Sequence, residues 1–466
     1  MNRNLIVLQG FMVNYSIIQK SQLEGGLRLD SEFYHPEKLE AMEKLSKFGV
    51  STITENFRNV KETFNPLRHQ LATTPARVFD LSDVSSFLLE EGKEIMEADE
   101  VGSTKKIFRQ NDVLISRLRP YLKEVSFVGF NDVQKLASTE FIVLRKKKDS
   151  KFPPQALFAF LITDEVQKIL FWSQGGTEHP RFSENLLMDL KLPKISEKIA
   201  ENITGDVNSA YKNYLISRNL YSQAEGLLLE ELGLKNFEVE EDLFYIVNLS
   251  EIKSSHRVDA EYFQPKYENL IMQIKKKVEM KQLKAIATTK RGSLIDPRFY
   301  SETEGTPYIR GKDFSSGRLE KSGLVYISID FRPKNETRVN AGDLVFALIG
   351  SVGTSALVNE EFHNSFISNN TGKISIKNKK EVLPEYLAAV LNSIVGKLQF
   401  EKEASQTAQP KISDSQVRNF YIPILPQFTQ QKIADLVQKS HEARSKAKQL
   451  LEEAKNKVAN LIEVKS

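Results

Sequence analysis

Two long stretches of the chain place an apolar or small residue at every third or fourth position. After Pro193 these residues are Ile199, Ile203, Val207, Ala210, Tyr214, Tyr221, Ala224 and Leu228. After Pro426 they are Ile433, Leu436, Ser440, Ala443, Ala447, Leu450, Ala454, Val458 and Leu461. This spacing predicts two long helices, each with one apolar face, and the second approaches a heptad repeat. We expect the helices to bury these faces against each other; the alternative is that each helix lies on its own domain.

The rest of the chain mixes short apolar runs with helical patterns. The runs rich in β-branched and aromatic residues are Val113–Ser116, Phe141–Leu144 and Leu344–Ile349. Helical spacing occurs over residues 36–47, 156–171, 265–277 and 384–398. Loops separate these elements irregularly, so the pattern predicts an α+β fold and not a regular βαβ alternation.

The chain also repeats itself. Arg28-Leu-Asp-Ser-Glu-Phe-Tyr-His-Pro36 matches Arg257-Val-Asp-Ala-Glu-Tyr-Phe-Gln-Pro265, and four further matches follow in the same order. They pair Val78 with Tyr308, Asn111 with Gly342, His179 with Gln409, and Leu192-Pro193 with Ile422-Pro423. The shift stays within one residue of 230 positions, as expected for two copies of one domain and too long for a solenoid. Residues 26–193 are called the first copy and residues 245–423 the second copy.

Composition narrows the class of protein only a little. The chain has 466 residues, 40% of them hydrophobic, no cysteine and a formal net charge of +4. The missing cysteines exclude disulfides, thiolate zinc sites and a thiol nucleophile. No apolar run is long enough to span a bilayer and the first residues do not resemble a signal peptide, so we expect a cytoplasmic protein without a membrane partner. The weak positive charge permits a nucleic-acid partner without requiring one.

Signatures of catalysis are missing or incomplete. The stretch Gly305–Asp313 has one residue too many for a phosphate loop, and Gly350–Gly353 fits a hairpin turn better than a dinucleotide-binding loop. The six histidines never occur at a metal-binding spacing. Asp80 with Glu91 and Lys93 imitates a nuclease motif, but such loose spacing arises by chance. The tetrapeptide expected of an amino-methyltransferase does not occur.

Several loops combine basic, amide, hydroxyl and aromatic side chains, and these loops differ between the copies. Such side chains can hold phosphates and read base edges, although most loops of this composition are simply solvated surface. The candidate DNA-binding residues in the first copy are Arg117, Arg119, Tyr121, Lys123, Thr177, His179 and Arg181. In the second copy they are Lys290, Arg291, Asn369, Asn370, Thr407, Gln409 and Lys411. Different loops on a shared frame suit a protein that reads two different DNA sequences.

The order of motifs resembles the specificity subunit of type I restriction-modification systems over nearly the whole chain. The resemblance is carried by Gly342-Asp343-Leu-Val at the start of a strand, Asn392-Ser393 at a helix end, and Pro410-Lys-Ile-Ser413 leading to Ile422-Pro-Ile-Leu-Pro426. Gln430-Gln431-Lys-Ile-Ala434 then opens the last helix. The first copy departs from this pattern at residues 192–200, which lack the paired prolines and the glutamine.

The resemblance implies an α+β chain with two duplicated α/β target-recognition domains, separated by two long antiparallel helices that form a coiled-coil spacer. The implied parts are an N-terminal segment (1–25), recognition domain 1 (26–193), a central spacer helix (194–236), a linker (237–244), recognition domain 2 (245–423) and a C-terminal spacer helix (424–466). No metal or cofactor site is expected in this chain.

The implied function is non-catalytic recognition of a bipartite, asymmetric sequence in double-stranded DNA. The implied partners are two modification subunits that methylate adenine, with restriction subunits added in systems that have them. S-adenosylmethionine, ATP and Mg²⁺ are expected on those partners. The alternatives are a stand-alone nuclease or methyltransferase with an unfamiliar site, and a protein-binding scaffold that does not touch DNA.

Overall fold

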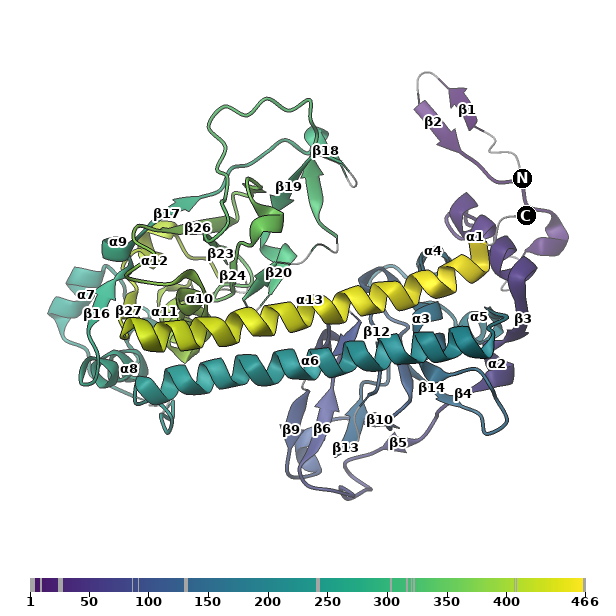
Figure 1. The fold of residues 1–466 in the computed structure, drawn as a ribbon, viewed down its shortest axis with the longest axis horizontal. Helices are drawn as coiled ribbons and strands as arrows, with labels where there is room; N and C mark the ends of the chain where they lie inside the picture. Colours follow the sequence, from purple (N-terminus) through teal and green to yellow (C-terminus); the bar gives the residue numbers. More distant parts are fainter. Residues whose placement is uncertain are drawn as a thin grey trace. The chain divides into compact units, whose positions relative to one another are not determined.

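The computed structural model describes residues 5–8, 11–23, 28–85, 87–90, 92–129, 133–239, 244–301, 304–315, 317–319, 321, 323–405, 407 and 409–463 (Figure 1). It divides into two compact units. Unit 1 contains residues 1–215 and 444–466, and unit 2 contains residues 216–443. The boundary falls inside both long helices, so each unit holds one copy and half of each helix. The predicted linker at 237–244 lies partly outside the described residues.

The first copy builds two main sheets from short strands. The five-stranded sheet has the order β5 (Thr63–Phe64), β10 (Lys105–Phe108), β13 (Gln134–Ala137), β6 (Ala76–Phe79) and β9 (Lys93–Ile95). The four-stranded sheet has the order β12 (Val125–Phe127), β11 (Val113–Ser116), β14 (Phe141–Lys146) and β4 (Phe57–Asn59). Small pairs join β3 (Gly49–Thr52) to β15 (Lys191–Pro193) and β7 (Val84–Ser85) to β8 (Leu88–Leu89). A separate hairpin joins β1 (Leu5–Leu8) and β2 (Phe11–Asn14).

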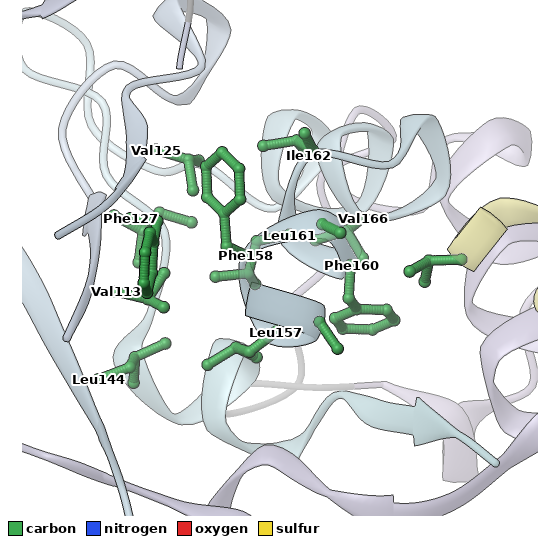
Figure 2. Close-up of a cluster of buried hydrophobic side chains, with 14 of the residues drawn as sticks. Val113, Val125, Phe127, Leu144, Leu157, Phe158, Phe160, Leu161, Ile162 and Val166 are labelled. Carbon is green, nitrogen blue, oxygen red and sulfur yellow. The ribbon is translucent and has the colours of Figure 1, made fainter. Parts of the chain in front are cut away.

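Its helices are short apart from the first. They are α1 (Pro36–Phe48), α2 (Ile53–Asn56), α3 (Pro154–Leu161), α4 (Asp164–Trp172) and α5 (Glu184–Asp189), with 3₁₀ turns at Lys20–Gln22, Leu81–Asp83, Asp99–Val101 and Pro120–Leu122. Proline occupies the first helical position of α1 and α3, where its missing N–H has no intrahelical partner to lose. In Figure 2, side chains of α3 pack against the strand residues Val113, Val125, Phe127 and Leu144 in the core of unit 1.

The second copy has two four-stranded sheets. One has the order β17 (Ala287–Arg291), β26 (Thr371–Ile376), β23 (Leu344–Ala347) and β24 (Ser355–Leu357). The other has the order β18 (Tyr300–Ser301), β22 (Val325–Ile327), β19 (Thr306–Ile309) and β25 (Phe366–Ile367). Pairs join β16 (Met280–Gln282) to β27 (Tyr421–Pro423) and β20 (Phe314–Ser315) to β21 (Arg318–Leu319).

Its helices follow the same plan. They are α7 (Leu249–Ser255), α8 (Pro265–Lys275), α9 (Leu283–Ile286), α10 (Pro384–Asn392), α11 (Ile394–Glu403) and α12 (Asp414–Val417), with 3₁₀ turns at Ala260–Phe263, Pro297–Phe299, Gly311–Asp313 and Glu360–Phe362. Gly350–Gly353 forms the turn of the hairpin between β23 and β24, as predicted.

The two copies share one topology. The sheet order β12-β11-β14-β4 becomes β24-β23-β26-β17 when each strand is replaced by its partner about 230 residues later. The parallel pairing of β6 with β13 likewise becomes that of β19 with β25. The α+β fold class and the duplication predicted from the sequence are therefore confirmed.

Two predicted helices are wrong because each is broken in the middle. Residues 156–171 divide into α3 and α4, and residues 384–398 lie in α10 and α11. At the first break Thr163 adopts an extended conformation and its hydroxyl donates to the Phe160 carbonyl (2.7 Å). At the second, the Ser393 hydroxyl accepts from the backbone N–H of Val395 (3.2 Å). The Thr163 hydroxyl thus satisfies a carbonyl at the end of α3, whereas the Ser393 hydroxyl caps the start of α11. Both bonds compete with continuation of the first helix.

The two long helices are α6 (Glu197–Glu231) and α13 (Gln427–Glu463). On α6, positions at heptad spacing are buried, and they are Ile203, Val207, Ala210, Tyr214, Ser217, Ala224 and Leu228. On α13 the buried series is Val437, Ser440, Arg444, Ala447, Leu451, Ala454 and Val458. The predicted apolar face of this helix is therefore partly wrong. The sequence pattern predicted burial of Leu436, Ala443, Leu450 and Leu461, whereas the buried residues are their neighbours Val437, Arg444, Leu451 and Ile462. Ala443 was predicted in place of Arg444 because a charged residue was not expected on the buried face of the helix.

Contacts within each unit show that the helices are antiparallel. In unit 1, Asp206 forms an ion pair with Lys457, and further along α6 the Tyr214 ring lies 4.4 Å from the guanidinium of Arg444. The residue number rises on one helix as it falls on the other. In unit 2, the Ser440 hydroxyl donates to the Ser217 carbonyl (2.7 Å) and lies 3.1 Å from the Ser217 hydroxyl. The predicted antiparallel pair is therefore confirmed.

Arg444 is buried in unit 1, where its guanidinium contacts Glu90 and the ring of Tyr214. Only 3% of its side chain is exposed, and its guanidinium donates to Glu90 (2.8 Å). The other oxygen of Glu90 accepts from the Tyr214 hydroxyl (2.6 Å), and burial followed by this negative charge raises the pKa of Tyr214. Glu90 directly follows β8, so this network anchors the β7–β8 hairpin of the first copy to the helix pair.

In unit 2 the corresponding face of α13 carries His441. Its Nε2 is buried with no hydrogen-bond partner among the described residues, and burial with the nearby Arg318 lowers its pKa to about 4. Between about pH 4 and pH 6.5, His441 is therefore neutral in the folded protein and protonated in the unfolded chain.

We predict an acid-sensitive contribution to stability from His441. Because its pKa is lowered on folding, its contribution is fully present above about pH 6.5 and is lost as the pH falls towards 4. The loss should reach about 2–4 kcal/mol. Urea unfolding of the wild type and of His441→Phe at a series of pH values measures it. The wild type should lose more stability than the variant between pH 6.5 and 4.5, and parallel profiles would contradict the prediction.

Candidate nucleic-acid interface

Three loops meet at the same place in each copy. The hairpin loop joins two antiparallel strands and spans residues 117–123 in the first copy and 348–353 in the second. The short loop precedes β14 or β26 and spans residues 138–140 or 368–370. The long loop follows α4 or α11 and spans residues 174–181 or 404–411, of which 406 and 408 lie outside the described residues. Twelve of the fourteen candidate residues belong to these loops.

Backbone hydrogen bonds join the loops in the same way in both copies. The hairpin loop donates to the short loop from Arg117 to Glu140 (3.1 Å), and from Leu348 to Asn370 (2.9 Å). It also donates to the long loop from Arg119 to Pro180 (2.7 Å), and from Gly350 to Pro410 (3.0 Å). Each long loop is closed at its base, by Gly175 with Arg181 and by Ser405 with Lys411. Since only main-chain atoms are used, the frame tolerates different side chains.

A duplicated arginine holds the start of each long loop. Arg28 pairs with Asp30 and donates to the Gln174 carbonyl (3.1 Å), whereas Arg257 pairs with Asp259 and donates to the Glu403 carbonyl (3.2 Å). Both bonds join residues 146 positions apart. The hydrogen bonds from each arginine lower the pKa of its aspartate, which therefore stays ionised. The repeated Arg-x-Asp motif found in the sequence is thus part of the loop support.

Two backbone positions in the hairpin loop have a left-handed conformation in both copies. In the second copy they are glycines, Gly350 with φ of 80° and Gly353 with φ of 94°. In the first copy they are Arg119 with φ of 48° and Lys123 with φ of 56°. A side chain in this conformation costs about 1 kcal/mol or more, which glycine avoids. Basic residues kept at such a cost indicate that their side chains have a function.

The structure ties two of the predicted first-copy residues to a carboxylate. Arg117 and Arg181 each donate from Nε to the same oxygen of Glu140 (both 3.0 Å), and Arg181 also donates to its second oxygen (2.7 Å). The hydrogen bonds from Arg181, then from Arg117, hold the pKa of Glu140 below its usual range. Lys61 and Asn59 contact a second carboxylate, Glu184.

The other first-copy candidates are placed at the surface of the same loops. Arg119 is half-buried, and Tyr121, Lys123, Thr177 and His179 are exposed. Their side chains can be reached by a ligand that approaches the three loops.

The second copy presents a different set of side chains on the same frame. Lys290 and Arg291, at the end of β17, are exposed, and Arg291 donates to the Asn369 carbonyl (2.6 Å). Exposed members of the short and long loops are Asn370, Thr407, Gln409 and Lys411, whereas Asn369 is half-buried. Asn370 occupies the position of Glu140, so the second copy has an amide where the first copy has a carboxylate.

Sequence reasoning missed Lys61, Glu140 and Glu184. Lys61 corresponds to Arg291 once the strand registers of β4 and β17 are aligned, which the sequence repeat alone did not reveal. The acidic residues were not predicted, because only basic, amide, hydroxyl and aromatic side chains were expected to contact DNA. The nuclease-like residues do not form a site: Asp80 pairs with Lys105 (3.2 Å), and Glu91 lies outside the described residues. Over the part of the chain that the structure describes, no cluster of potential metal ligands and no helix able to span a membrane is found.

Residues 275–456 match the family model of the type I restriction modification DNA specificity domain. Most of the second copy, together with part of α13, therefore matches a type I DNA specificity domain. This match agrees with the resemblance found in the sequence and supports DNA recognition for a type I system over a stand-alone nuclease or methyltransferase. The specificity domain covers β26, β23 and α10–α12 together with most of α13.

Similar solved structures include three from type I systems. The S subunit from M. genitalium is 14% identical, covers 89% of this chain and 94% of its own, and has a TM-score of 0.42. The HsdS subunit from Thermoanaerobacter tengcongensis is 16% identical, covers 90% and 95%, and has a TM-score of 0.30. A chain from a structure on complex assembly and conformational transition of the type I R-M system is 18% identical, covers 88% and 96%, and has a TM-score of 0.31. No curated protein matches.

Proposed function

We propose that this chain reads a bipartite, asymmetric DNA sequence, with one half bound by the three loops of each copy. The observation that carries the proposal is the shared backbone frame with different side chains, above all Arg119 and Lys123 against Gly350 and Gly353. Two equivalent frames suit two half-sites, and different side chains make the halves different in sequence. Recognition domains at 26–193 and 245–423, with the linker at 237–244, belong to this proposal.

The long helices act as the spacer between the half-sites and as the support for partner subunits. Two duplicated domains would hold two modification subunits, which carry S-adenosylmethionine and methylate adenine. Restriction subunits with ATP and Mg²⁺ join in systems that have them. The chain itself takes no cofactor and works in the cytoplasm. Its lack of recognisable catalytic motifs supports a recognition role without chemistry.

We predict that removing the two strained cations weakens DNA binding but not the fold. In Arg119→Gly/Lys123→Gly, relief of left-handed strain offsets the added entropy of glycine, so stability should stay within about 1 kcal/mol of wild type. Affinity for the target should fall at least about tenfold, with a smaller dependence on salt because fewer phosphates are contacted. Titration of labelled duplex at several salt concentrations measures both effects.

The matched control removes the same charge from the first copy at a distance. Lys147 and Lys148 follow β14 at the end opposite the short loop, about 20 Å away for a six-residue strand. Lys147→Ala/Lys148→Ala should retain most of the affinity. Equal losses in both double variants would mean that only total charge matters, and unchanged binding by the glycine variant would contradict the proposed interface.

A further prediction separates recognition from catalysis. The purified chain should neither transfer labelled methyl groups from S-adenosylmethionine to DNA nor cleave DNA with Mg²⁺. The sequence lacks the methyltransferase tetrapeptide, and the described residues contain no cluster of metal ligands. Methyl transfer should appear only when the modification subunits are added. Methylation or cleavage of DNA that co-purifies with the chain, at a rate proportional to the concentration of the chain, would support the enzyme alternative instead.

A further inference from the structure

In the first copy, one acidic side chain lies between the arginines of two loops. Glu140 of the short loop accepts from Arg117 of the hairpin loop and from Arg181 of the long loop. A carboxylate repels phosphate, so its position within a basic DNA-binding surface needs an explanation. A purely structural explanation would require the ion pairs to hold the three loops together.

The second copy shows that the loops do not need these ion pairs. The residues equivalent to Arg117, Glu140 and Arg181 are Leu348, Asn370 and Lys411, which cannot form such a bridge. The backbone bonds between the loops are nevertheless kept, with Leu348 donating to Asn370 and Ile412 donating to Leu348 (both 2.9 Å). The bridge in the first copy is therefore an addition to a frame that already forms without it.

The bonds of the bridge divide the two arginines into different roles. Arg181 donates to both oxygens of Glu140 and, from Nη1, to the His179 carbonyl (2.9 Å), so all three of its nitrogens are engaged within the protein. Arg117 donates to Glu140 only through Nε. Its terminal nitrogen Nη1 lies 3.9 Å from Glu184, at the outer limit of an ion pair. Such a long contact can give way to the paired contact that the terminal nitrogens of arginine make with O6 and N7 of guanine or with a phosphate.

We propose that Glu140 is a positioning residue that sets base specificity in the first half-site by fixing the guanidinium of Arg117, with Arg181 holding Glu140 in place. This inference rests on the proposed function. The negative charge of Glu140 also repels phosphate. DNA bound in a shifted position, with a phosphate next to Glu140 instead of a base edge, is therefore disfavoured. The second copy, with Asn370 at this position, selects its bases without such a bridge.

The test compares two carboxylates of the same surface. Glu140→Gln and Glu184→Gln each remove one negative charge, but only Glu140 bridges both arginines by hydrogen bonds. Glu184 pairs with Lys61 and lies 3.9 Å from Nη1 of Arg117. A glutamine at 140 has a single acceptor oxygen. If that oxygen takes the place of Oε2, the NH₂ group faces Nη2 of Arg181 and the two-bond contact that holds residue 140 is lost. The target is first selected from randomised duplexes with the wild-type complex, including its modification subunits. Each base pair is then substituted in turn and binding is measured.

Both variants should bind non-specific duplex slightly better than wild type, by roughly 2- to 5-fold. Only Glu140→Gln should lose discrimination, by about 10- to 100-fold at one or two positions of the first half-site. Discrimination in the second half-site should be unchanged, which also shows that the variant is folded. Arg181→Lys, which keeps the charge but cannot grip both oxygens, should give the same loss and provides the test if Glu140→Gln does not fold.

Three results would overturn the inference. Glu140→Gln could keep wild-type discrimination, it could lose discrimination equally in both halves, or Glu184→Gln could lose as much at the same positions. A wild-type complex that shows no sequence preference in either half would instead overturn the proposed function and this inference with it.

Discussion

The arrangement depends on backbone hydrogen bonds that join three loops in each copy. Bonds from Arg119 to Pro180 and from Gly350 to Pro410 use no side-chain atoms, so they survive the exchange of arginine for glycine at the same position. Side chains can then diverge without loss of the frame, as the change from Glu140 to Asn370 shows. A recognition surface that separates its support from its specificity in this way can be duplicated and altered one half at a time.

Polar side chains interrupt the otherwise apolar faces that the two long helices bury. Arg444 with Glu90 and Tyr214 in unit 1, and Ser217 with Ser440 in unit 2, are buried and hydrogen-bonded. An apolar seam tolerates sliding by a heptad, but a buried arginine or serine that slides loses its partner. These contacts therefore fix the register of the helices within each unit.

Much of the fold followed from the sequence because periodicity and repetition are strong signals. The long helices, the duplication and the strands at Val113–Ser116 and Phe141–Leu144 were predicted from them. The breaks at Thr163 and Ser393 were missed, because local hydrogen bonds of these two hydroxyls interrupt an apolar pattern that is otherwise continuous. Arg444 was missed because burial of a charge depends on Glu90, which is 354 residues away in the chain.

The candidate site was also predicted only in part. Loop composition identified Arg117, Arg119 and Asn370, because basic and amide residues in variable loops suggest base and phosphate contacts. It could not identify Glu140 or Lys61, whose importance depends on which loops and strands lie together. The left-handed backbone at Arg119 and Lys123 was also invisible in the sequence, since glycine marks this conformation only in the second copy.

The most direct test exchanges the loops between the copies. Residues 117–123, 138–140 and 174–181 are replaced by residues 348–353, 368–370 and 404–411, together with Lys61→Arg. If one frame serves both copies, the chimera should fold and select a DNA target that contains the second copy's half-site twice. A folded chimera that still selects the original first half-site would contradict the central claim that these loops determine which sequence each copy reads.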